Sequence, residues 1–384
     1  MIRLLSIILG VLLAAGAGVA LKTLDPARQP EVMALQPPDQ FPLPPQQVVA
    51  LLTEAVSRDS ANPYRWADLG QALADANDLP KARTCYTRTL ELSRDIPQIW
   101  LRDANFHFQL GEPEQALDTA SRVLKTVPDY DAILFGYFTQ FGLKAPVVLS
   151  KIGDDRRAVR SYTQYLIDHN VPDDATVAWR HAEASAFSDE RLTASYIDCL
   201  LRARRYDQAQ SDWLAFLGEN RDGYPEKNLV FNGGFERVPT PSVFDWRIQP
   251  ADGVETVRDP SGHDGHWALR VKFDGKSNVS FDNVSEVSRI RPGAYRLRAW
   301  VRTQGITTNE GPRLEVQDAE SAARLDVRTE PFLGTQDWHL VQQAFTVPSG
   351  TNLVAVRVVR QPSQKFDNKI TGMFWLDSVE LVNY

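Results

Sequence analysis

The sequence predicts a multidomain protein of α and β class, in which an α-solenoid of helical repeats precedes a β-sandwich. Between residues 46 and 222 apolar residues recur at spacings of three and four, the period of amphipathic helices. From residue 228 onward, short runs alternate between apolar and polar residues, as half-buried strands do. Twelve of the 22 glycines lie in these last 157 residues, where turns between strands use them.

Composition excludes several classes of protein. Hydrophobic residues make up 43% and charged residues 24% of the 384 residues, the balance of a globular chain with room for two to three domains. The net charge of −7 provides no overall basic field for nucleic acid. The only cysteines, Cys85 and Cys199, cannot form a disulfide scaffold or a four-cysteine zinc site. We expect them to be separate, buried and reduced.

The N-terminal residues 1–21 are predicted to be a membrane anchor or a signal peptide. Eighteen uncharged residues, 4–21, follow Arg3 and would span about 27 Å as a helix, enough for a bilayer core. Small residues at Gly18 to Ala20 also offer a cleavage site. In both cases the body is expected to be exported, either anchored in a bacterial inner membrane and facing the periplasm, or secreted.

Residues 22–45 are predicted to form a proline-rich linker. Seven prolines lie between Pro26 and Pro45, and such a composition favours an extended polyproline conformation.

The predicted helical domain, residues 46–222, contains an internal period of 34 residues. Pro63 recurs as Pro97, Trp66 as Trp100, Ala82 as Ala116 and Leu90 as Leu124. This pattern resembles the tetratricopeptide repeat, in which small residues let two helices of a hairpin approach and aromatic residues fill the groove between hairpins. The resemblance implies binding of protein partners. We expect Trp66, Trp100 and Trp213 to belong to the core.

The predicted sandwich, residues 228–384, contains eight candidate strands without a convincing helix. Turn signals such as Arg291-Pro292-Gly293 separate them, and eight strands of this length predict a two-sheet jelly roll. The candidate strands are residues 228–231, 267–273, 277–283, 294–303, 313–317, 338–346, 353–360 and 375–382.

Three sequence runs resemble the galactose-binding-like carbohydrate-binding modules of families 4, 9 and 22. They are the opening Asn228–Glu236, the central Tyr295–Arg302 and the closing Phe374–Leu381. The resemblance implies a glycan ligand and a structural calcium ion held by Glu236 and Asp377, whose carboxylates are the hard oxygen ligands that calcium prefers. Repeats followed by such a module also resemble exported proteins of bacterial exopolysaccharide gene clusters.

The central run supplies the candidate sugar-binding residues. Alternation places Arg298, Trp300 and Arg302 on one face of a strand, with Tyr295, Leu297, Ala299 and Val301 on the core face. Sugars offer apolar ring faces and hydroxyl groups, which match an indole flanked by polar groups. We expect Glu315 and Gln317, on the next strand along the chain, to lie beside Trp300. Alternatively, a loop or the repeat domain covers Trp300 on a solvated sheet.

The remaining tryptophans of the sandwich and its histidine pair are assigned structural roles. Trp246, Trp267, Trp338 and Trp375 are expected in the core or at an edge. His263 and His266 fit an exposed turn better than a transition-metal site.

The sequence contains no catalytic motif of the common hydrolase, nucleotide-binding or metalloprotease kinds. We therefore expect a non-catalytic envelope adaptor that binds protein through its repeats and polysaccharide through its sandwich. The alternatives are a structural scaffold whose sandwich binds no sugar and an unrecognised glycan-active enzyme. The sequence does not identify the glycan, the protein partner or the oligomeric state.

Overall fold

The computed structural model describes residues 43–383 of the chain. The predicted anchor and nearly all of the predicted linker lie outside these residues. In the described range, no helix combines the length and the apolar character that a membrane crossing needs. The chain divides into two compact units between Ser161 and Tyr162. We call the described residues 43–161 the N-terminal unit and residues 162–383 the C-terminal unit.

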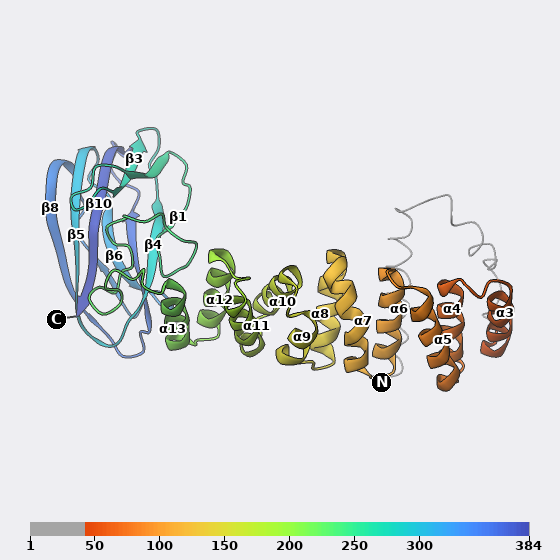
Figure 1. The fold of residues 1–384 in the computed structure, drawn as a ribbon. Coiled ribbons are helices and arrows are strands. Elements are labelled where there is room, and N and C mark those ends of the chain that lie inside the picture. Colours follow the sequence, from red (N-terminus) through yellow and green to blue (C-terminus); the bar gives the residue numbers. More distant parts are fainter. Residues whose placement is uncertain (1–42, 384) are drawn as a thin grey trace. The chain divides into compact units, whose positions relative to one another are not determined.

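The N-terminal unit is entirely helical (Figure 1). Most of its helices begin with a proline in their first turn, where the fixed φ angle suits a helix and the missing N–H is not needed. The helices are α3 (Pro45–Arg58), α4 (Pro63–Asp75), α5 (Leu79–Leu92), α6 (Pro97–Gln109), α7 (Pro113–Thr126), α8 (Asp131–Gln140) and α9 (Ala145–Ile152), with a 3-10 turn, η1 (Pro128–Tyr130), before α8.

The 34-residue period corresponds to successive helical hairpins. The first helices of three hairpins, α4, α6 and α8, begin at Pro63, Pro97 and Asp131. Gly70 shows why a small residue is needed, because a Cβ there would lie 3.0 Å from ring carbons of Tyr86 on α5. The period then ends because α8 has 10 residues and α9 only 8. The helical-repeat prediction is confirmed, and Trp100 lies in the core as expected, whereas Trp66 is half-buried.

Helix α10 (Arg156–Asp168) spans the division between the units, and three further helices open the C-terminal unit: α11 (Pro172–Ala184), α12 (Glu190–Arg202) and α13 (Tyr206–Leu217). Trp179 of α11 stacks on Tyr196 of α12, with ring centroids 4.5 Å apart. Trp213 of α13 is fully buried. Cys85 and Cys199 are both buried free thiols, as predicted.

Two five-stranded antiparallel sheets follow, which confirms the predicted β-sandwich. The first sheet has the order β1-β4-β9-β6-β7 and the second the order β2-β3-β10-β5-β8 (Figure 1). The strands are β1 (Arg247–Ile248), β2 (Val254–Asp259), β3 (Ala268–Asp274), β4 (Phe281–Arg289), β5 (Gly293–Ile306), β6 (Arg313–Asp318), β7 (Asp326–Arg328), β8 (Gly334–Val347), β9 (Leu353–Arg360) and β10 (Thr371–Asn383).

The opening run Asn228–Glu236 is not a strand, contrary to the prediction for residues 228–231. Its backbone is tied to the end of β10 by Asn228, whose side chain donates to the Val379 carbonyl and accepts from the Leu381 N–H, both at 2.9 Å. Gly233 permits this close approach, since a Cβ there would lie 2.1 Å from the Val379 carbonyl oxygen. Through this attachment the run contributes Val230 and Phe235 to the core of the sandwich.

The core between the sheets sets the orientation of every outer side chain. Tyr295, Leu297, Ala299 and Val301 of β5 are buried in it, as the alternation predicts. Arg296, Arg298, Trp300 and Arg302 consequently lie on the outer face of the second sheet. Trp246 is in this core, 1% exposed, with its ring centroid 5.0 Å from that of Phe235.

The last helices pack on the sandwich within the C-terminal unit. Trp213 of α13 meets the buried Phe231 edge-on, with centroids 6.0 Å apart. Three polar pairs surround this contact: Arg247 with Asp198, Arg289 with Asp207, and the Tyr206 hydroxyl with Glu320. The predicted domain limits, 46–222 and 228–384, remain a prediction.

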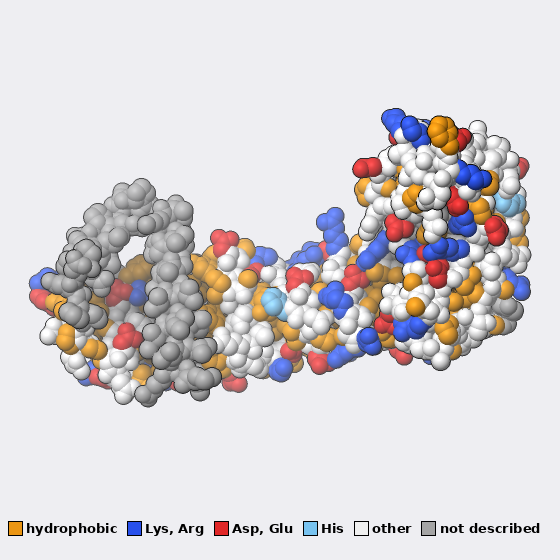
Figure 2. Space-filling model, turned by 180° about the vertical axis from the view of Figure 1, so that it is seen from behind, with side chains coloured by type: hydrophobic (Ala, Val, Ile, Leu, Met, Phe, Trp, Pro, Cys, Tyr) orange, Lys and Arg blue, Asp and Glu red, His pale blue; other side chains and the backbone are white. Residues whose placement is uncertain are grey.

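The surface carries both signs of charge close together. In Figure 2, Lys and Arg side chains are interspersed with Asp and Glu side chains over the face of the described residues that is shown there. This mixed surface agrees with the small net charge of the chain.

Candidate functional site

Aromatic side chains gather on the outer face of the second sheet. Cross-strand pairing places Trp375 of β10 opposite Arg302 of β5, and Asp377 of β10 opposite Trp300. Trp338 is on the neighbouring strand β8, and His263 comes from the loop between β2 and β3. We call His263, Trp300, Arg302, Trp338 and Trp375 the aromatic face.

Trp300, the predicted sugar platform, is half-buried and partly covered. The His263 ring stacks on it, with ring centroids 3.7 Å apart and an interplanar angle of 13°. The same imidazole meets Trp338 edge-on at 5.7 Å. A loop residue thus occupies the position on the Trp300 ring that a pyranose would take, as the alternative interpretation of the sequence anticipated in part.

Arg302 lies between two indoles. Its guanidinium carbon is 4.0 Å from the ring centroid of Trp375 and 5.4 Å from that of Trp338. Stacking of this kind is favourable because the π-face of an indole attracts a cation, and it leaves the N–H donors at the guanidinium edge. Trp375 is 5% exposed, so the lower side of this arrangement is excluded from water.

Arg298 is on the same outer face but is paired with Glu380, with an N–O distance of 3.2 Å. Both side chains are about two-fifths exposed, and such a pair contributes little to stability. Arg298 therefore lies at the margin of the aromatic face.

Glu315 and Gln317 do not lie beside Trp300, which corrects the sequence prediction. They are on β6, in the first sheet, whereas the neighbours of β5 are β10 and β8. The chain crosses to the other sheet after β5 and returns as β8, so consecutive strands are not adjacent. Glu315 is 2% exposed and pairs with Arg328 at 2.7 Å and Arg357 at 2.9 Å. Gln317 accepts a hydrogen bond from Arg357.

The two predicted calcium ligands hold the loop that carries His263. Asp377 Oδ2 accepts from the backbone N–H groups of His263 at 2.7 Å and Asp264 at 3.0 Å. Glu236 Oε1 accepts from the N–H groups of His266 at 2.8 Å and Trp267 at 2.9 Å. Burial raises the pKa of the Asp377 carboxyl, and these N–H bonds oppose the increase.

This arrangement does not fit a calcium ion as it stands. Asp377 Oδ1 accepts from the Ser378 N–H at 2.6 Å, so three of the four carboxylate oxygens already face hydrogen-bond donors. Among the described residues, no group of three or more His, Cys, Asp or Glu side chains is arranged to hold a metal. Calcium binding by Glu236 and Asp377 remains a prediction from the family resemblance.

The sequence prediction missed the roles of His263, Trp338 and Trp375. The signal for Trp375 was present in Phe374–Leu381, because the apolar Phe374 and Leu376 mark the core face and place Trp375 and Asp377 outside. No local pattern indicates that His263 stacks on Trp300, since 37 residues separate them in the chain.

A groove of about 390 Å³ lies along β8. Leu340, which pairs with Trp300 across the strands, lines it together with Gln342. The other lining residues are Thr329, Glu330, Pro331, Phe332, Gln336, His339, Val341 and Gln343. This groove offers amide and hydroxyl groups, and none of the five residues of the aromatic face lines it.

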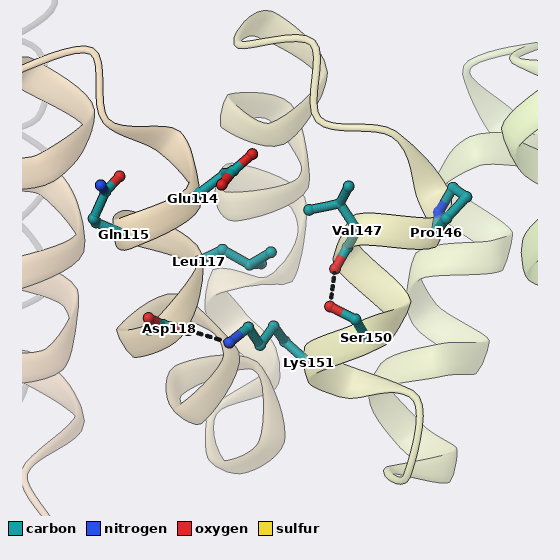
Figure 3. A pocket seen from close by; sticks show the side chains of 8 residues that line it. All are labelled: Glu114, Gln115, Leu117, Asp118, Pro146, Val147, Ser150 and Lys151. Carbon is teal, nitrogen blue, oxygen red and sulfur yellow. Dashed lines mark hydrogen bonds and ion pairs between the residues drawn. The ribbon is translucent and has the colours of Figure 1, made fainter.

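The N-terminal unit has a separate hollow of about 610 Å³ between α7 and α9 (Figure 3). Asp118 of α7 and Lys151 of α9 form an ion pair across it, with a distance of 2.6 Å. Leu117 and Val147 supply apolar surface, and Val147 is 37% exposed.

Residues 67–131 match the family described as tetratricopeptide repeat, which confirms the resemblance stated for the helical region. A search of curated protein sequences found no match.

The structure is also similar to solved carbohydrate-binding modules. TmCBM61, solved with β-1,4-galactotriose, is 18% identical, with 41% of this chain and 100% of that chain covered and a TM-score of 0.30. A family 16 carbohydrate-binding module is 22% identical, with coverages of 41% and 100% and a TM-score of 0.29. The CBM22-1 xylan-binding domain of Paenibacillus barcinonensis Xyn10C is 12% identical, with coverages of 39% and 91% and a TM-score of 0.27.

Proposed function

We propose that the protein is a non-catalytic adaptor that binds a polysaccharide on the aromatic face and a protein partner on the helical repeats. The observation that carries the proposal is the gathering of three indoles, an imidazole and a guanidinium on one outer sheet face. Indoles bind the apolar faces of sugar rings, and the polar groups beside them take the hydroxyls.

The sugar ring stacks on Trp338, or on Trp300 after His263 moves aside. Trp338 is half-buried on the edge strand β8, and other residues of the same strand line a groove. The loop carrying His263 is held by two backbone N–H bonds to Asp377 of β10 and two to Glu236 of the opening run, so its displacement costs binding energy.

The cellular setting belongs to the same proposal. The uncharged residues 4–21 support export across a membrane, with the body on the outer side of that membrane. A polysaccharide-binding module tethered there fits a role in exopolysaccharide export or assembly.

Retention of the full chain in native gels that contain a series of polysaccharides tests the sugar-binding proposal. We expect at least one polymer to retard the protein, and Trp338→Ala to remove that retention. Loss of a stacking aromatic at a binding hot spot costs about 2 kcal/mol, roughly 30-fold in affinity. Trp300→Ala should also weaken retention, with a small loss of stability because His263 covers one side of the ring.

Two control variants make the gel experiment decisive. Phe366→Ala removes a fully exposed aromatic side chain from another loop of the sandwich and should leave retention unchanged. Trp246→Ala removes a core side chain and should instead cost about 3–5 kcal/mol of folding free energy. If Phe366→Ala abolishes retention and Trp338→Ala does not, the sugar site is in the loops at the sandwich end.

The second candidate is a structural scaffold whose sandwich binds no sugar. The half-buried state of Trp300 favours this candidate, because the stacked His263 ring already occupies the face of the indole that a sugar would use. Absence of retention by every polysaccharide tested would support this candidate over the first.

A further inference from the structure

We propose that the aromatic face recognises an acidic polysaccharide built from uronic acid residues, with Arg302 binding the carboxylate. This inference rests on the proposed function and specifies its ligand class. Its basis is the contrast between Arg302 and the two paired arginines on the same face, Arg270 and Arg298.

The other arginines with described partners on this face are neutralised by the protein itself. Arg270 of β3 pairs with Glu255 at 3.4 Å and with Asp259 at 3.3 Å. Arg298 pairs with Glu380 at 3.2 Å. Each of these carboxylates comes from an adjacent strand, so residues of the same sheet neutralise the charges of Arg270 and Arg298.

Arg302 differs because its described side-chain contacts are the two indoles alone. Within residues 43–383 its guanidinium makes no hydrogen bond or ion pair, and the rings of Trp375 and Trp338 lie 4.0 Å and 5.4 Å from it. Its N–H groups are not among the buried polar atoms that lack a partner. The guanidinium edge therefore remains open to an acceptor from outside.

A uronic acid matches this surface in two ways. Its ring has an apolar face that an indole can stack on, and its carboxylate is planar and accepts two parallel N–H bonds from a guanidinium. Stacking between indoles fixes the guanidinium plane, so little conformational freedom is lost when a carboxylate binds. A neutral sugar has no charged group that could form an ion pair with the Arg302 guanidinium.

The test compares one polymer with and without its carboxylates. Polygalacturonate and its carboxyl-reduced form share the same chain and linkage, and each is added to native gels of the full chain. We expect retention by polygalacturonate to exceed retention by the reduced polymer by about tenfold in affinity, and to weaken as salt is raised. A neutral β-1,4-galactan serves as a third polymer.

Arg302→Gln should lower the affinity for polygalacturonate by about tenfold and make the two forms of the polymer equal. Arg302→Lys keeps the charge but not the planar fork, so it should recover only part of the affinity. Arg88→Gln, which removes an arginine paired with Glu91 in the N-terminal unit, is the matched control for total charge and should not change retention. Melting temperatures of all variants are measured alongside.

Each outcome assigns the result to one proposal. Equal retention by polygalacturonate and its reduced form, or preference for the neutral galactan, leaves sugar binding intact and overturns the acidic ligand. An unchanged preference in a folded Arg302→Gln variant also overturns it. If no polymer is retained at all, sugar binding by the aromatic face fails, and the acidic ligand fails with it.

Discussion

Glu286 is a buried acidic side chain, and one of its two carboxylate oxygens has no hydrogen-bond partner among the described residues. Its Oε1 accepts the Phe231 N–H at 2.7 Å, while Oε2 has no hydrogen-bond partner in the described structure. Burial raises the pKa of Glu286 well above its usual value of 4.5, and the nearby carboxyl of Asp245 adds to the increase. Burial also raises the pKa of Asp245, so two buried carboxyls lie beneath the opening run.

The raised pKa of Glu286 predicts a pH dependence of stability. The folded state holds the proton more tightly than the unfolded state, so its stabilising effect is full below about pH 4.5. It is lost as the pH rises from there through the folded pKa. Glu286→Gln should therefore flatten the fall in unfolding free energy as the pH rises above about 4.5.

Denaturant unfolding at a series of pH values measures this effect. Glu219→Gln, which changes an exposed glutamate, is the control and should keep the pH dependence of the original protein. An unfolding free energy that varies with pH in Glu286→Gln as it does in the original protein would show that another group is responsible.

At the scale of elements, the loop between β2 and β3 connects the two predicted sites. Asp377 and Glu236 bind its backbone, and His263 at its tip stacks on Trp300. Arg258 adds a further tie, since it donates to the Phe235 carbonyl at 2.8 Å and stacks over Trp267 at 4.3 Å. The residues predicted for calcium and for sugar thus belong to one structural assembly.

Chelation tests whether Asp377 and Glu236 hold the β2–β3 loop by hydrogen bonds alone or also bind calcium. Because backbone N–H groups already face three of the four carboxylate oxygens, we expect thorough chelation to leave the melting temperature unchanged. Asp377→Asn should lower it, since the amide cannot accept as many N–H bonds as the carboxylate. A melting temperature that falls on chelation and returns with calcium but not magnesium would establish the calcium site.

At the scale of the whole molecule, the last helices and the sandwich form one compact unit. Phe231, 2% exposed, is covered by Trp213 of α13 and by Tyr224, with ring centroids 6.0 Å and 5.6 Å away. Three polar pairs tie α12 and α13 to the sandwich as well. Removal of the helices would expose apolar surface that the sandwich normally buries.

Two fragments test how far the sandwich depends on these helices. We expect residues 228–384 to fold alone, because the core between the two sheets is complete within them. Residues 162–384 should fold with a higher melting temperature, since they retain the contacts of Trp213 and Tyr224. Equal melting temperatures would show that the helices contribute nothing, and failure of the shorter fragment to unfold cooperatively would show a shared core.

Helix and strand periods are local, so sequence patterns predict most of the elements and the face of each that meets the core. The 34-residue recurrence of Pro63 and Trp66 predicted the hairpins, and alternation from Tyr295 to Val301 placed Trp300 and Arg302 outside the core. Strands β1, β2 and β7 were not predicted, and β1 and β7, with two and three residues, are too short to show a recognisable period. The run Asn228–Phe231 was predicted as a strand because its apolar residues are typical of strands. In the structure the run is not a strand, and Asn228 is hydrogen-bonded to β10.

The pairing of elements, in contrast, does not follow from local patterns. Pairing between strands depends on contacts far apart in the chain, so local alternation could not place β8 rather than β6 beside β5. For the same reason the structure places Glu315 and Gln317 outside the predicted site. It places Trp338, Trp375 and His263 within the site, where the sequence did not predict them. The composition of the aromatic face follows from the crossing of the chain between the two sheets, which no local pattern in the sequence encodes.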